Sequence, residues 1–334
     1  MLGDERAVSV AAGAYHSLAL TADGSVWSWG GGFSGQLGHG DEQDQLLPKK
    51  IETFAGRRVV AVSVGLYHSI AITADGSAWS WGDGDYGRLG HGDQQDQLLP
   101  KQVEAFAGQR VVAVSAGARH SLATTADGAA WSWGLGGAGR LGHGDQQRQL
   151  LPKRVEAFAG RRVVAVAAGG IHSLAITADG AVLSWGDGVS GRLGHGDTQN
   201  QLLPKKVETF AGRRVVAVSA GDRHSIAITA DGAVWSWAME PLASWATATS
   251  RTSCCPSRSK PSLGSASSLC RLRNTIASPS PPTAVFMLGV WANAAALGPR
   301  RGPVAPAAAQ EDRAIRGEGA GAVRGFARDI LIVC

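Results

Sequence analysis

Residues 60–111 read VAVSVGLYHSIAITADGSAWSWGDGDYGRLGHGDQQDQLLPKQVEAFAGQRV, and this unit recurs along the chain with a period of 52 residues. Full copies occupy 8–59, 60–111, 112–163 and 164–215, and a partial copy occupies 216–237. A fixed period of this length is typical of propellers, solenoids and arrays, in which each unit buries its apolar face against its neighbours. The repeat stops after Trp237. The sequence therefore predicts a repeat domain over 1–237 and a different segment over 238–334.

Alternation within one unit predicts four short strands. VAVSVG and HSIAIT each alternate, and Asp75-Gly76 separates HSIAIT from a third run, SAWSWG. An Asp-Gly pair between two alternating runs is a hairpin signal, because glycine accepts the left-handed backbone that the turn needs. QLLPKQVEAF follows a glycine-rich loop, and Pro100 cannot donate a ladder hydrogen bond, so this fourth strand is expected at an edge. Four strands in about 50 residues make one propeller blade.

Paired tryptophans explain how such blades would join. Trp79 and Trp81 are two residues apart, so both point to one face of their strand. A single blade cannot bury that face alone. At roughly 25 cal/mol per Å2 over about 150–250 Å2 of aromatic surface, each tryptophan can stabilise the contact by several kcal/mol. The second tryptophan of the pair recurs at Trp29, Trp81, Trp133, Trp185 and Trp237.

Histidine, glycine and aspartate also recur in every unit. A His-Gly-Asp group such as His91 to Asp93 has the residue types of a metal site or an acid–base pair. Each blade holds the same group, however, so the copies would lie apart around the ring, and we expect loop-stabilising hydrogen bonds instead. Gly82, Gly84 and Gly87 fit a dinucleotide fingerprint, but the helix that would hold the pyrophosphate does not follow. The recurring structural positions are His16, His68, His120, His172, His224, Gly38, Gly90, Gly142, Gly194, Asp41, Asp93, Asp145 and Asp197.

The pattern GxxHSLALTxDGxVWSWGxGxxGQLGHGD resembles the repeat of the regulator of chromosome condensation family over 8–237. The resemblance implies a seven-bladed β-propeller, and the family includes an exchange factor for a nuclear Ras-like GTPase, a plant UV-B photoreceptor and scaffold or ligase-associated domains. The photoreceptor branch implies a tryptophan in the GxxH segment, which this chain does not have. With fewer repeats than seven, we expect an all-β, incomplete propeller: an open arc of about four blades plus a fragment. The last tryptophan face, at Trp237, would then need a covering surface.

Charge and composition restrict the function. Residues 238–334 carry 11 basic and 5 acidic residues, which leaves 21 basic and 22 acidic residues in the repeats. Because nucleic-acid binding needs a field of one sign, no specific nucleic-acid site is expected. No apolar run is long enough for a membrane span. All four cysteines lie in 238–334, and repeats without cysteine suit the cytoplasm or the nucleus.

The segment 238–334 is rich in Ser, Pro, Ala and Arg, so its composition predicts an irregular tail. Suppose that the coding DNA of this segment is read in the frame that starts one nucleotide earlier. Codons that are compatible with the given residues can then spell G-D-G-(A/T)-S-G-(K/Q)-L-G-H-G-D over 238–249 and QQDQLLPK over 250–257. The same frame spells S-I-A-I-T-A-D-G-x-V-Y-V-W-G-V-G over 277–292. We therefore expect a single-nucleotide frameshift near codon 237, of which Cys254, Cys255, Cys270 and the basic charge of the tail are by-products.

These observations favour a non-enzymatic protein–protein interaction scaffold that binds another protein through its blade loops. No catalytic residue, cofactor or metal is predicted. An alternative that the resemblance permits is a guanine-nucleotide exchange factor for a small Ras-like GTPase, which would then be the partner. A further alternative is a non-functional truncated fragment of a longer repeat protein. We also expect self-association through the open edge, and a cytoplasmic or nuclear location.

Overall fold

A computed structural model describes residues 5–238 and 253–258, which form five antiparallel four-stranded sheets, each of them one blade. The first blade contains β1 (Ala7–Ala12), β2 (His16–Thr21), β3 (Val26–Gly30) and β4 (Gln45–Lys50). The second contains β5 (Val59–Val64), β6 (His68–Thr73), β7 (Ala78–Gly82) and β8 (Gln97–Gln102), and the third β9 (Val111–Ala116), β10 (His120–Thr125), β11 (Ala130–Gly134) and β12 (Gln149–Arg154). The fourth contains β13 (Val163–Ala168), β14 (His172–Thr177), β15 (Val182–Gly186) and β16 (Gln201–Lys206), and the fifth β17 (Val215–Ala220), β18 (Ser225–Thr229), β19 (Val234–Ala238) and β20 (Ser253–Arg258).

Each blade is a simple meander, in which strands are hydrogen-bonded in chain order. The Asp-Gly turns join the second and third strands as predicted: Gly76 has φ +90°, and its N–H donates to the Thr73 carbonyl at 2.8 Å. The proline-bearing strand lies at the outer edge of every sheet, also as predicted. Within the described ranges the helical elements are three-residue 3-10 turns, and none could span a membrane.

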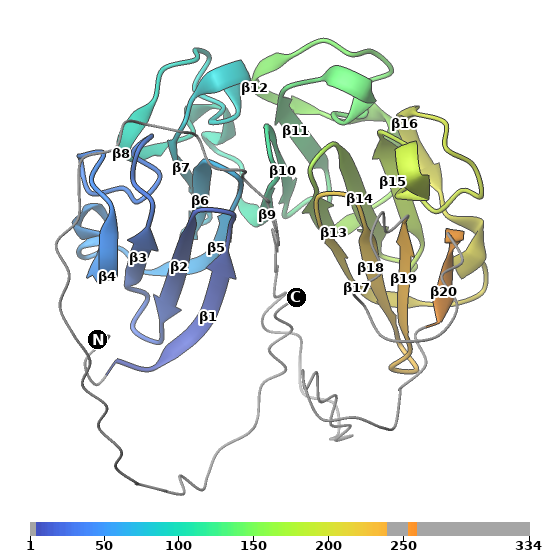
Figure 1. Ribbon diagram of the computed structural model, residues 1–334, viewed down its shortest axis with the longest axis horizontal. Coiled ribbons are helices and arrows are strands. Elements are labelled where there is room, and N and C mark those ends of the chain that lie inside the picture. The colour runs from blue at the N-terminus through green and yellow to red at the C-terminus, as the bar shows by residue number, and fades with distance from the viewer. Residues whose placement is uncertain (1–4, 239–252, 259–334) are drawn as a thin grey trace, which may run out of the picture.

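The five blades lie along an arc (Figure 1), with the first strands β1, β5, β9, β13 and β17 on its inner side. Consecutive blades contact each other through these inner strands, and the first and fifth blades form the two ends of the arc. The fold is therefore an all-β, incomplete propeller.

The cores lie between blades, and the tryptophans of one blade face the blade before it. Trp81 of the second blade packs against Leu18, Leu20 and Val26 of the first. The Trp81 ring lies 5.8 Å from the ring of Phe54, in η1 (Glu52–Phe54) between the two blades. The same cluster recurs at the next three interfaces around Trp133, Trp185 and Trp237. Each tryptophan thus closes an interface with the preceding blade.

This direction corrects the expectation that the last tryptophan face is open. Trp237 is 2% exposed, because the fourth blade covers it. The less covered tryptophan is Trp29, which is half-buried, because within 5–238 and 253–258 no blade packs on that side of the first one. At the other end, the uncovered face of the fifth blade is aliphatic.

The fifth blade is also more complete than predicted, since β20 falls within the segment expected to be irregular. It pairs with β19 through Trp235↔Arg258 and Ser236↔Ser257, each pair 52 residues beyond its counterpart in the fourth blade, Leu183↔Lys206 and Ser184↔Lys205. Strand pairing uses backbone groups, so a segment at the right spacing can complete the sheet without the repeat's side chains. The rest of 239–334 lies outside the described residues. The irregular tail expected over 238–334 therefore stays a prediction for that part of the chain.

Candidate functional site

The GxxH histidines join consecutive blades rather than forming a common site. The Nε2 atoms of His16, His68, His120 and His172 lie 2.8–2.9 Å from a serine hydroxyl of the next blade: Ser69, Ser121, Ser173 and Ser225, respectively. Each of these four rings is at most 2% exposed. Burial lowers the pKa of His16 and His172 to about 3, so the rings stay neutral. Buried neutral rings shared between blades serve packing, not proton transfer with solvent.

The LGHGD segments stabilise the loops in which they lie. The Nε2 atom of His91 lies 3.0 Å from the hydroxyl of Ser80, and a carboxylate oxygen of Asp93 accepts the N–H of Gln95 at 3.1 Å. His39, His143 and His195 face Ser28, Ser132 and Ser184 in the same way, and Asp41, Asp145 and Asp197 accept N–H groups of Gln43, Gln147 and Gln199.

The glycine of that segment has a steric role. A Cβ on Gly90, at φ +81°, would lie 2.9 Å from the Nε1 atom of Trp133 in the next blade. Gly38 and Gly142 stand in the same relation to Trp81 and Trp185. Gly194 has φ +76°, the same backbone conformation. The segment therefore brings the loop of one blade against the tryptophan of the next.

The meander gives the propeller two different ends. The GxxH end carries the turns between first and second strands and the loops between third and fourth; these touch, as in the 2.8 Å hydrogen bond from the Gly31 N–H to the Tyr15 carbonyl. The Asp-Gly end carries the Asp-Gly turns and the links between blades, such as 51–58.

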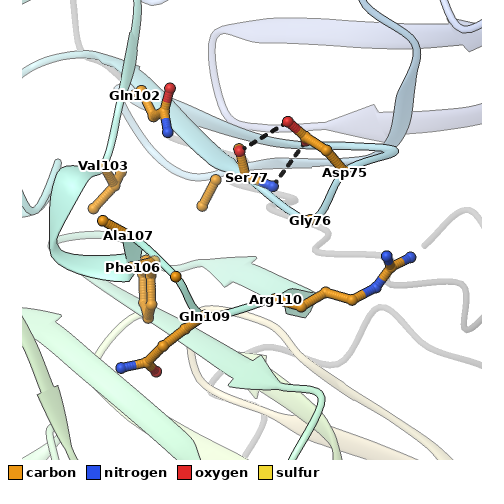
Figure 2. A pocket seen from close by; sticks show the side chains of 11 residues that line it. Asp75, Gly76, Ser77, Gln102, Val103, Phe106, Ala107, Gln109 and Arg110 are labelled. Carbon is orange, nitrogen blue, oxygen red and sulfur yellow. Dashed lines mark hydrogen bonds between the residues drawn. The ribbon is translucent and has the colours of Figure 1, made fainter.

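Shallow pockets at the Asp-Gly end repeat from blade to blade. Figure 2 shows one of about 300 Å3, lined by Asp75, Gly76, Phe106 and Arg110, with Asp75 hydrogen-bonded to Ser77. The equivalent pocket of about 340 Å3 is lined by Asp127, Gly128, Phe158 and Arg162. Because the lining recurs 52 residues later, neither pocket distinguishes one blade from another. Within the described residues there is no cluster of three or more metal-ligating side chains.

The GxxH end is where the blades differ. The two residues inside the GxxH turn are Ala-Tyr, Leu-Tyr, Ala-Arg, Gly-Ile and Asp-Arg in the five blades. The loops after the third strand differ likewise: GGFSGQ over 31–36, DGDYGR over 83–88, LGGAGR over 135–140 and DGVSGR over 187–192. At the other end, the links read AGRR, AGQR, AGRR and AGRR. The GxxH end therefore carries the surface that differs from blade to blade.

An aromatic cluster lies on the first two blades at this end. Tyr15 stacks on Tyr67 with ring centroids 5.2 Å apart, and Phe33 contacts both edge-on at 5.5 and 5.6 Å. Tyr15 is 48% exposed and Phe33 50% exposed. Exposed and clustered aromatic rings are typical of the centres of protein interfaces.

A basic patch, Arg119, Arg140 and Arg148, follows on the third blade. Arg119 replaces Tyr67 of the second blade, Arg148 replaces Asp96, and Leu135 and Gly137 replace Asp83 and Asp85. The Arg119 guanidinium lies 5.5 Å from the Tyr86 ring, and Arg148 donates to the Gln94 side chain, which also accepts the Tyr86 N–H. Both exposed arginines thus flank one loop, and the charge reverses between two adjacent blades.

Arg140 adds a buried positive charge to this patch. Its counterpart Arg88 is paired at 3.0 Å with Asp83, whose position is taken by Leu135 in the third blade. Arg140 donates to the carbonyls of Gly137 and Gly170, as Arg88 does to those of Asp85 and Ala118, but it has no carboxylate in place of Asp83. Burial, and next the charge of Arg119, lower the pKa of Arg140 to about 10. Such a field attracts an anionic group.

The basic patch and the aromatic cluster were missed in the sequence. The features that all repeats share predict binding through the blade loops in general, and not a site on one blade. The detectable signal was the set of positions at which the repeats differ. The dinucleotide-like glycines lead into η2 (Asp85–Gly87), a three-residue turn, so the described loop has no helix at which a pyrophosphate would bind.

Comparisons with known proteins agree with this architecture. Residues 2–174 match the model of the RCC1-like domain, and 163–192 and 179–228 match models of the regulator of chromosome condensation (RCC1) repeat. Human E3 ubiquitin-protein ligase HERC2 is 42% identical over 232 residues, covering 69% of this chain and 5% of the ligase. The ultraviolet-B receptor UVR8 of Arabidopsis thaliana is 40% identical over 229 residues, covering 68% of this chain and 52% of the receptor.

Among solved structures, Prp20p of Saccharomyces cerevisiae has a TM-score of 0.64 at 26% identity, covering 72% of this chain and 59% of Prp20p. The chain thus spans about half or less of the two curated relatives. The model of the RCC1-like domain matches more than half of the chain, and four full repeats follow one another in register. The chain belongs to the regulator of chromosome condensation repeat family.

Proposed function

We propose that this chain is a non-enzymatic interaction module that binds a partner protein at its GxxH end. Acidic side chains of the partner would contact the basic patch, and apolar side chains the aromatic cluster. The observation that carries the proposal is the charge reversal on the third blade, where Arg119 and Arg148 replace residues of the repeat that are tyrosine and aspartate in the second. A cytoplasmic or nuclear location is part of the same proposal.

A peptide-display selection against the full chain tests the proposal. Enriched peptides should be acidic and aromatic or aliphatic, and their affinity should fall at least about tenfold in Arg119→Glu/Arg148→Glu, because opposite charges become like charges. Arg161→Glu/Arg162→Glu is the matched control, since both of these exposed arginines lie at the Asp-Gly end. Peptides that lose affinity equally in both variants would contradict binding at the GxxH end.

The rival function, guanine-nucleotide exchange, is supported by the likeness to yeast Prp20p, whose structure was described with its binding to Gsp1p and histones. Yeast Prp20p also has a structure bound to Kap60. Release of labelled guanine nucleotide from small Ras-like GTPases measures exchange directly. Stimulated release by this chain would establish the rival and reject a purely non-enzymatic module.

The frameshift near codon 237 remains a proposal, and with it the idea of a non-functional fragment. The register of β20 supports it, because the strand sits where the repeat would place QLLPKK. The two adjacent cysteines also support the frameshift. Cysteine codons end in T or C, and that base of the Cys254 codon followed by the TG of the Cys255 codon gives TTG or CTG, both of which encode leucine. Sequencing the coding DNA decides, since a minus-one frame without LGHGD and QLLP removes the proposal.

A further inference from the structure

The two ends of the arc carry different apolar faces. On the first blade, Ala12 is exposed, and Val10, Ser17 and Trp29 are half-buried. The residues that occupy these positions in the second blade, Val62, Val64, Ser69 and Trp81, are at most 4% exposed. The first blade thus presents the side that, in the later blades, packs against a preceding blade.

The fifth blade presents the opposite side. Ile226, Ile228 and Val234 are half-buried there. Their equivalents are covered in the other blades: Leu18, Leu20 and Val26 in the first, Ile70, Ile72 and Ala78 in the second, and Leu174, Ile176 and Val182 in the fourth. These aliphatic side chains are the ones that receive the tryptophan of the following blade.

The two uncovered faces are therefore the two halves of an interface that the chain builds four times internally. In each internal copy a buried tryptophan of one blade meets this set of positions on its neighbour, which is aliphatic in the first, second and fourth blades and reads Leu122, Thr124 and Ala130 in the third. The triplet of the fifth blade, Ile-Ile-Val, differs from the Leu-Leu-Val of the first by the shape of its side chains and not by polarity. Closely similar side-chain sets pack against a tryptophan in this geometry at three of the internal interfaces.

We propose that the first blade of one copy packs against the fifth blade of a second copy, with Trp29 seated on Ile226, Ile228 and Val234 of that copy. This contact is independent of the partner proposed for the GxxH end. Because the two surfaces are different patches, the contact is head-to-tail, and it continues to further copies until a ring closes or a filament forms. The occupant is a second copy of the chain, because the chain itself carries both complementary faces.

Sedimentation velocity of the full chain over a range of concentrations tests the contact. Wild type should gain mass with concentration. Trp29→Glu and Ile228→Glu should each be monomeric, with a dissociation constant at least about 100-fold higher, because a charge would be buried without a partner. Leu99→Glu is the control: this leucine is 50% exposed on the outer strand β8, so its replacement should leave association unchanged.

Mixing the two variants identifies a head-to-tail contact. Trp29→Glu keeps an intact fifth blade and Ile228→Glu an intact first blade, so an equimolar mixture should form a dimer and stop there. Circular dichroism checks that each variant keeps its strands. A monomeric wild type, which an intramolecular cover of the faces would give, overturns the proposal. So does association that is lost in Trp29→Glu but retained in Ile228→Glu, since that result indicates contact between two first blades.

Discussion

Replacement of Trp133 by alanine should cost far more stability than the same replacement at Trp29. Trp133 is fully buried between the second and third blades, its ring lies 5.8 Å from Phe106, and its Nε1–H donates to the Arg88 carbonyl at 2.8 Å. Truncating a buried tryptophan costs about 3–5 kcal/mol, and loss of its hydrogen bond adds up to about 1 kcal/mol, although the Arg88 carbonyl keeps the Ser121 hydroxyl as a donor at 2.8 Å. Trp29 occupies the same position of the repeat without a preceding blade, so its loss should cost less than about half as much.

Urea unfolding followed by far-ultraviolet circular dichroism measures both losses, at concentrations low enough to keep the chain monomeric. Repeat proteins unfold in units whose stability depends on neighbouring interfaces, so hydrogen exchange should also show the third blade opening first in Trp133→Ala. Trp131→Leu is a mild control, because the fourth blade already has Leu183 at that position with 2% exposure. Equal losses for Trp29→Ala and Trp133→Ala would refute the direction of packing described above.

Three other outcomes follow from the geometry. Stability should fall below pH 6.5, because burial lowers the pKa of His16 and His172 to about 3, so that the unfolded chain binds more protons than the native chain between pH 6.5 and about 3. Each such histidine removes about 1.4 kcal/mol at one pH unit below 6.5, and urea unfolding that is unchanged at about pH 5.5 would contradict this. Gly117→Ala should lower the melting temperature more than Gly160→Ala does. The new Cβ at position 117 would lie 2.6 Å from the Gly169 carbonyl, whereas Gly160 has a positive φ but nothing within 4 Å of such a Cβ. Equal shifts of the melting temperature would argue against a close approach of the blades. Ala138→Gly should raise the free energy of unfolding by up to about 1 kcal/mol, because Ala138 has φ +58° in a loop, and a loss of stability there would show that its methyl group packs.

The blades could be predicted from the sequence because each local signal agrees with the others. Alternating runs become strands, Asp75-Gly76 becomes the hairpin turn, and Pro100 lies on the outer strand. The orientation of the packing could not be predicted in this way. Alternation places Trp79 and Trp81 on one face, but it does not distinguish the blade before from the blade after. The position of Phe54, in the link that follows the fourth strand, decides between them in the folded chain.

The completed fifth sheet marks another limit of reasoning from composition. Residues 253–258 have none of the repeat's leucines, and their serines and cysteines predict no strand. The outer edge of β19 offers unpaired backbone groups, however, and a segment 52 residues after β16 reaches them in the same register. Spacing, and not side-chain pattern, therefore carried the information about this strand.

The candidate site could in principle be read from the sequence, but not from the features that reveal the fold. A repeat predicts what every blade shares, whereas recognition of one partner requires what a single blade has alone. Comparison of the units at corresponding positions isolates Leu135 and Arg148 in the third blade, beside Arg119, whose position is also arginine in the fifth blade (Arg223). Only the antiparallel meander shows that these positions, far apart within the unit, meet at one end of the propeller: Arg119 in the first turn accepts the N–H of Leu135 in the third loop at 2.8 Å. The charge reversal is therefore a local surface feature of the third blade, and the proposed partner site rests on it.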